Sequence, residues 1–231
     1  MLGKTHRLGG IGFGIGTVQL LSLVNIVLNP ISAVGYVSGS ALGSLIPDID
    51  HQGSTLGKQL KPVSKAVSKI AGHRGATHYP ITCVAYTIIM VCLSKVLASV
   101  KEFNMITGIL VALLFSFTMT PLIKLIIKSF HIRLNKAIYF GLPYILVILG
   151  LVVVFNLKDT AILFTTSLLL GSCMGYLSHL ILDAFTVAGI PLFGPAVKTN
   201  FRLTKAKTGG GIEIFGIVLS IIVAIVGNFV F

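Results

Sequence analysis

The sequence predicts an all-α fold, a polytopic bundle of about seven transmembrane helices with a cytoplasmic N-terminus. Of the 231 residues, 55% are hydrophobic and only 10% are charged, and the mean hydropathy is +0.97. Long apolar runs take up most of the chain, and a helix satisfies all of its backbone hydrogen bonds inside a bilayer. The basic residues gather in alternate loops, as the positive-inside rule requires. A soluble monomer is therefore excluded.

Seven segments have, or nearly have, the length needed to cross a hydrocarbon core of roughly 30 Å. Asn29-Pro30 marks a turn between the first two, which are rich in small residues, so they form either two closely packed spans or a re-entrant hairpin. Lys4 and Arg7 precede the first run as in a signal peptide, but no small-residue cleavage pattern follows, and we expect this run to be retained. The segments are residues 8–29, 30–47, 79–97, 104–123, 137–157, 160–182 and 212–231.

The charge distribution predicts the orientation. Seven spans that start from a cytoplasmic N-terminus place fifteen of the 18 Lys and Arg residues inside and leave Lys95, Lys101 and Lys158 outside. The net charge of +12 is then an orientation signal, and the basic residues meet anionic lipid headgroups. We expect membrane lipids as partners and no nucleic acid, because no recognised nucleic-acid motif accompanies the charge.

Residues 57–70 form an amphipathic segment on the predicted inner side. Helical spacing places Val63, Ala66, Val67 and Ile70 on one face, with lysines around them. This pattern is typical of a helix that lies on an anionic membrane surface.

Histidines and acidic residues are rare, six of each, and nine of these twelve fall on the predicted inner face. They come from His6, from I-P-D-I-D-H at 46–51, from G-H-R-G-A-T-H at 72–78, from Y-L-S-H-L-I-L-D at 176–183, and from Glu213. Imidazole and carboxylate donors without thiolates suit zinc, manganese or iron. There are more donors than one ion needs, so we expect two or more ions, zinc first, with manganese as the alternative. The candidate metal ligands are His6, Asp48, His51, His73, His78, His179 and Asp183.

Two of these groups also have structural interpretations. The acids at 48–51 could cap a helix after Pro47, and His179 and Asp183, spaced i and i+4, could be a buried polar pair. As a set, ionisable groups at a bilayer face favour a functional site.

The expected chemistry is hydrolysis of a phosphoester. Paired metal ions clamp the attacking and leaving oxygens of such a displacement, and Arg74 can grip phosphate through its planar fork. Asp50 or Glu213 would be the general base or a hydrogen-bond partner of the ligands. The sequence therefore predicts a membrane-embedded metal-dependent hydrolase whose substrate is a phosphoester such as a lipid headgroup. The alternatives are a metal-ion or proton-coupled transporter, and a noncatalytic protein in which metal holds helix ends together.

The three motifs, with F-R-L at 201–203 and T-H at 5–6, resemble the YdjM-like family of inner-membrane metal-dependent hydrolases, a family described as LexA-regulated. The resemblance covers residues 40–90 and 171–215 of a single integral membrane domain, 1–231, and leaves the inserted spans at about 98–160 unmatched. The family is more distantly similar to zinc-dependent phospholipases C. The resemblance implies a hydrolase of the inner membrane whose site comprises His6, Asp48, Asp50, His51, His73, Arg74, His78, His179, Asp183 and Glu213.

Overall fold

The computed structural model describes residues 1–72, 75–99, 109, 112–113, 116, 120, 123–124, 127, 132–133, 135–197 and 199–226. These residues are mainly helical, with one isolated antiparallel bridge between Ile190 and Phe201, so the all-α class is confirmed for them. The α-helices are α1 Gly3–Leu23, α2 Pro30–Gly43, α3 Thr55–Gln59, α4 Lys61–Ala71, α5 Pro80–Ala98, α7 Lys136–Asn156, α8 Lys158–Ala184 and α9 Gly211–Val226; the 3-10 turns are η1 Pro47–Asp50 and η2 Ala76–His78.

The number of spans is smaller than expected within these ranges. By length and composition, α5 and α8 are the two described helices that are long and apolar enough to cross a membrane. Helix α2 has 14 residues, a length of about 21 Å at the usual rise per residue, which is short of a full crossing. Most of the predicted span 104–123 lies outside the described residues. The expectation of about seven spans is therefore not confirmed.

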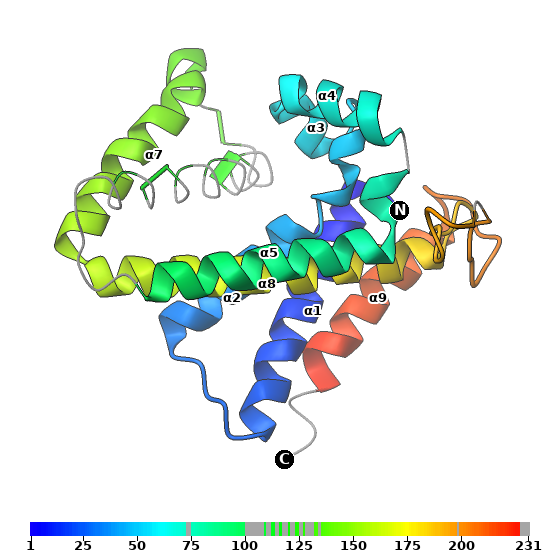
Figure 1. Ribbon diagram of the computed structural model, residues 1–231, viewed down its shortest axis with the longest axis horizontal. Coiled ribbons are helices and arrows are strands. Elements are labelled where there is room, and N and C mark those ends of the chain that lie inside the picture. The colour runs from blue at the N-terminus through cyan, green and yellow to red at the C-terminus, as the bar shows by residue number, and fades with distance from the viewer. Residues whose placement is uncertain are drawn as a thin grey trace.

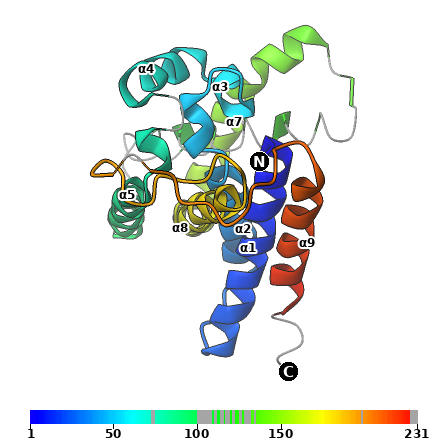
Figure 2. The same ribbon diagram turned by 90° about the vertical axis from the view of Figure 1, so that its right-hand side faces the viewer.

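Two groups of helices cross each other (Figure 1). Helices α2, α5 and α8 lie side by side along the long axis of the molecule, while α1 and α9 pack together and run across them. Figure 2 looks towards the end of α8 and shows α1 and α9 side by side. The first residues of α1, the last of α2 and α8, and the first of α5 thus reach the same region of the molecule.

The contact between α2 and α8 depends on small residues. Gly35, Gly39 and Gly43 follow one another at four-residue intervals on α2, and each faces the backbone of α8. A Cβ atom on Gly39 would come 2.0 Å from the carbonyl oxygen of Leu168. Small residues at this spacing let membrane helices approach backbone to backbone. This contact brings the end of α2 beside His179.

Helix α1 packs closely against α2 and α9 in the same way. Gly10 and Gly14 face Ser40 of α2, and Gly12 faces Ser220 of α9. The hydroxyl of Ser40 donates a hydrogen bond to the Gly10 carbonyl over 2.6 Å. These contacts place the first turn of α1, with His6, over the C-terminal part of α8.

Candidate metal centre

The candidate site forms where four chain segments end or begin. Pro47 starts η1, which three residues separate from the end of α2, and Pro80 occupies the first turn of α5, which one residue separates from η2. Proline suits the first helical turn because its missing N–H would have no intrahelical acceptor there. Asp48 and His78 therefore lie in short turns at helix ends, where they meet residues of α1 and α8.

His179 of α8 is fixed by a backbone carbonyl. Its Nδ1 atom lies 2.7 Å from the carbonyl oxygen of Ser44, just after α2, and both residues are fully buried. Because a carbonyl oxygen only accepts, Nδ1 carries the hydrogen and donates it. A neutral ring then has its lone pair on Nε2, the atom that faces the site.

His78 is fixed in the same sense by two side chains. The hydroxyl of Thr77 donates to Asp50 Oδ2 over 2.8 Å, so its single proton is used and its oxygen accepts from His78 Nδ1 at 3.1 Å. Asp50 Oδ2 itself lies 3.4 Å from His78 Nδ1. This arrangement also puts the lone pair of His78 on Nε2.

The two Nε2 atoms face each other at 3.3 Å. Asp183 Oδ2 lies 3.6 Å from the Nε2 of His179 and 3.8 Å from that of His78. Two ring nitrogens and a carboxylate at these distances can share either a proton, in a hydrogen bond between the rings, or a metal ion. Nitrogen ligands at 2.0–2.1 Å from a tetrahedral zinc ion are about 3.3–3.4 Å apart. The donor set and its spacing therefore fit a divalent metal.

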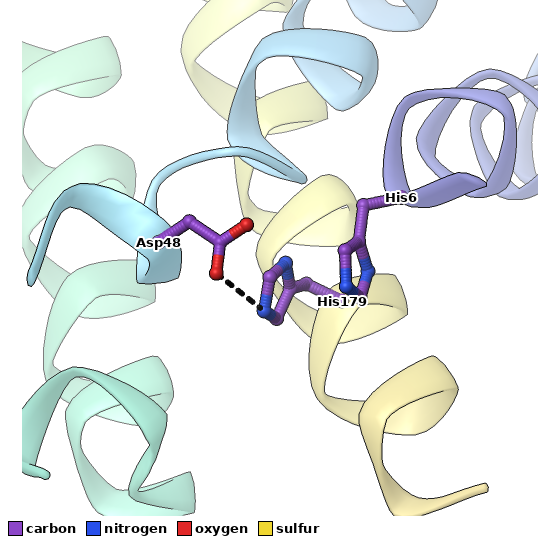
Figure 3. Close-up of side chains that lie close together, drawn as sticks. All are labelled: His6, Asp48 and His179. Atoms are coloured by element: carbon purple, nitrogen blue, oxygen red, sulfur yellow. Dashed lines mark ion pairs between the residues drawn. The ribbon is translucent and has the colours of Figure 1, made fainter. Parts of the chain in front are cut away.

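A second group of donors adjoins the first (Figure 3). His6 stacks on the ring of His179 with centroids 3.7 Å apart, and Asp48 Oδ1 lies 3.9 Å from His179 Nε2. The Nε2 atom of His6 lies 3.2 Å from Asp183 Oδ1. Its buried Nδ1 atom has no hydrogen-bond partner within the described part of the chain, which is unusual for a buried polar atom. Two groups of three donors thus share His179.

Burial differs across this five-residue cluster, which consists of His6, Asp48, His78, His179 and Asp183. Asp48 is the one member with appreciable side-chain exposure, 22%, and desolvation by partial burial raises the pKa of its carboxyl.

The α-ammonium group of Met1 donates to Asp183 Oδ1 over 2.6 Å. Positive charge therefore already lies against one oxygen of this buried carboxylate.

Of the predicted site residues that the structure describes, Asp50, His51 and Glu213 are not members of the cluster, and Asp50 lies behind His78. His51 is exposed, and its Nδ1 accepts from the Gly53 backbone N–H at 3.3 Å. Glu213, in the first turn of α9, accepts from the backbone N–H groups of Leu2 and Gly209. His73 and Arg74 lie outside the described residues.

Sequence reasoning missed the groups that orient the histidines. The Ser44 carbonyl has no side-chain signature, so no motif could reveal it. Thr77 does have one, because it stands directly before His78 in the G-H-R-G-A-T-H motif. A hydroxyl beside a candidate metal ligand is a candidate for the hydrogen bond that fixes its ring.

The fold and the site define a class: a helical membrane protein with a buried His/Asp cluster suited to a metal ion. A family model described as YdjM inner membrane protein matches residues 1–230, and the chain belongs to this family of inner membrane proteins. The resemblance seen in the motifs is thereby confirmed at the level of the family.

Individual relatives agree with this assignment. The chain is 27% identical over 183 residues to inner membrane protein YdjM of Escherichia coli K12, and equally to that of Shigella flexneri; the matches cover 78% of the chain and 60% of the relatives. It is 35% identical over 78 residues to the uncharacterized protein YvsG of Bacillus subtilis 168, over 34% of the chain and 44% of the relative. The match thus spans about three fifths of the YdjM proteins. No solved structure matches the chain.

Proposed function

We propose that the chain is a membrane-embedded, metal-dependent hydrolase that cleaves a phosphoester at the cytoplasmic face of the membrane. The observation that carries the proposal is the pair of facing Nε2 atoms of His78 and His179, 3.3 Å apart. Each ring is oriented from behind by a protein acceptor, as in metal sites where outer hydrogen bonds set the tautomer of a ligand.

Each residue has a role in this proposal. His78, His179 and Asp183 hold one ion, while His6 and Asp48 extend the site towards a second. Asp50 positions His78 from behind through Thr77. Zinc held by these residues would supply Lewis-acid chemistry, which favours attack on a phosphoester.

The substrate is proposed to be the phosphoester of a lipid headgroup. The cluster lies at the end of α2, before the start of α5 and within the last two turns of α8, so it belongs to a helix-end region of the bundle. Arg74, in the same short motif as His78, is proposed to bind the phosphate by its bidentate fork.

The first experiment measures metal. The chain is purified in detergent without added chelator, and its bound metal is determined by mass spectrometry beside a His179→Ala variant. His51→Ala is the matched control, because this exposed histidine lies outside the cluster. We expect bound zinc in the parent and in His51→Ala, and loss of at least one ion in His179→Ala. A folded parent without metal would overturn the proposal.

The second experiment separates hydrolysis from transport. Phosphate or phosphoalcohol release is measured with a generic phosphodiester and with phospholipid in the same proteoliposomes that are used for metal uptake. We expect metal-dependent release that is lost in His179→Ala, and no uptake above that of empty vesicles. Metal uptake without phosphate release would assign the cluster to a transport path. Metal binding without either activity would mean that the metal only holds helix ends together.

A further inference from the structure

Helix α4 carries an apolar face that the rest of the described chain does not cover. Ile70 is 87% exposed and Val63 is 48% exposed, and Ala66 between them is also exposed. These three positions recur at intervals of three and four residues, so they form one stripe along the helix. Nearly complete exposure of an isoleucine on a helix of 11 residues points to a partner.

A different face attaches α4 to the protein. Ser64 is fully buried, and α4 contacts η1 and α3. The side chain of Gln52 donates to the hydroxyl of Ser68 over 3.2 Å. The helix is therefore attached to the protein through the face that carries Ser64 and Ser68, and its apolar stripe does not take part in this attachment.

The lysines that border the stripe indicate what kind of partner it binds. Lys58, Lys61 and Lys65 are exposed, Lys69 lies in the last turn of α4, and no Asp or Glu occurs between Asp50 and Glu102. An apolar stripe bordered by lysines matches a surface that is apolar inside and anionic outside. Two copies of this face would bring eight lysines together without a counter-charge, which opposes self-association.

We propose that α4 lies in the headgroup layer of an anionic membrane, with Val63, Ala66 and Ile70 inserted and the lysines on lipid phosphates. Because α4 packs on η1, which carries Asp48 and Asp50, this contact holds the cluster next to the membrane surface. The inference rests on α4 alone and does not depend on whether the cluster hydrolyses anything.

The test exploits the absence of tryptophan from the chain. A single Trp is placed on the apolar stripe in Ile70→Trp with Lys65→Gln, and on the exposed lysine-bearing face in Lys65→Trp, so that both variants lack the same lysine. The whole chain is reconstituted into nanodiscs containing phosphatidylglycerol or only phosphatidylcholine. Fluorescence quenching by lipids brominated on their acyl chains is then measured.

In anionic nanodiscs we expect at least about twofold stronger quenching of Trp at position 70 than at position 65. We expect this excess to fall in phosphatidylcholine and in high salt, because the lysine contribution is electrostatic. Equal quenching at the two positions would overturn the proposal. So would a blue-shifted, unquenched Trp at position 70 in nanodiscs that hold two copies, since the stripe would then be a contact between copies.

Discussion

His78 and His179 are 101 positions apart in the chain, and their Nε2 atoms face each other at 3.3 Å. This contact is not local in sequence, because His78 stands just before α5 and His179 lies near the end of α8. Each ring has its Nδ1 engaged, by Thr77 and by the Ser44 carbonyl. In the proposed metal site both Nε2 atoms bind the ion, so folding of this region is expected to be linked to metal binding.

Removal of metal should destabilise the protein. A ligand present at 100 times its dissociation constant stabilises the state that binds it by about 2.7 kcal/mol, so a chelator should lower the Tm measured in detergent, and added zinc should restore it. In His78→Ala both the fall and the recovery should be much smaller. An unchanged Tm in a parent that has verifiably lost its metal would contradict the linkage.

Asp50→Asn should weaken metal binding without abolishing it. The substitution keeps an oxygen that accepts from Thr77 but removes the charge 3.4 Å from His78 Nδ1, and changes to such outer partners cost roughly 10–100-fold in metal affinity. Competition with a chromophoric chelator measures the affinity. Asp159→Asn is the control, because Asp159 is exposed in the first turn of α8. Equal affinities for both variants would remove Asp50 from the positioning role.

Glu213→Ala should lower stability more than metal content. The Glu213 carboxylate accepts from the backbone N–H groups of Leu2 and Gly209 and from the hydroxyl of Thr5, so it joins the start of α1 to the start of α9. Loss of charge-assisted hydrogen bonds of this kind costs about 1–3 kcal/mol. Thermal unfolding and metal analysis on one preparation check this.

The catalytic role expected for Glu213 stays a prediction, and the same variant tests it. If Glu213→Ala keeps its Tm and its metal but loses turnover, the residue acts in the reaction. The hydrogen bonds of its carboxylate then contribute little to the stability of the fold. A loss of Tm with turnover per folded molecule preserved would place it among the structural contacts instead.

Gly39→Ala should disrupt the contact between α2 and α8. The added Cβ would lie 2.0 Å from the Leu168 carbonyl oxygen, backbone that cannot move aside cheaply, and overpacking of this kind costs about 1–3 kcal/mol. Gly141→Ala in α7 is the matched control, because a Cβ there meets no described atom within 4 Å. The control should be neutral or slightly stabilising, since alanine favours the helix. Equal Tm values for the two variants would argue against the close packing of α2 on α8.

Much of the fold class was predictable from local pattern alone. The apolar runs at 79–97, 137–157 and 160–182 coincide closely with α5, α7 and α8, because length and hydropathy are properties of a contiguous segment. The run at 30–47 was harder to interpret. Its helix, α2, ends at Gly43, and Pro47 begins η1. The apolar segment is therefore nearly long enough to cross a membrane, but the helix that it contains is too short.

The candidate site divides in the same way. Composition and the i, i+4 spacing of His179 and Asp183 were enough to predict a histidine–carboxylate site at a helix end, because those residues share one helix face by geometry. Tertiary structure decided which other residues join them. Asp50 lies behind His78, whereas the adjacent His51 is exposed, and the Ser44 carbonyl orients His179. The direction of a side chain in a turn, and the backbone group opposite it, depend on how α1, α2, α5 and α8 pack, which the residue pattern of any one segment does not contain.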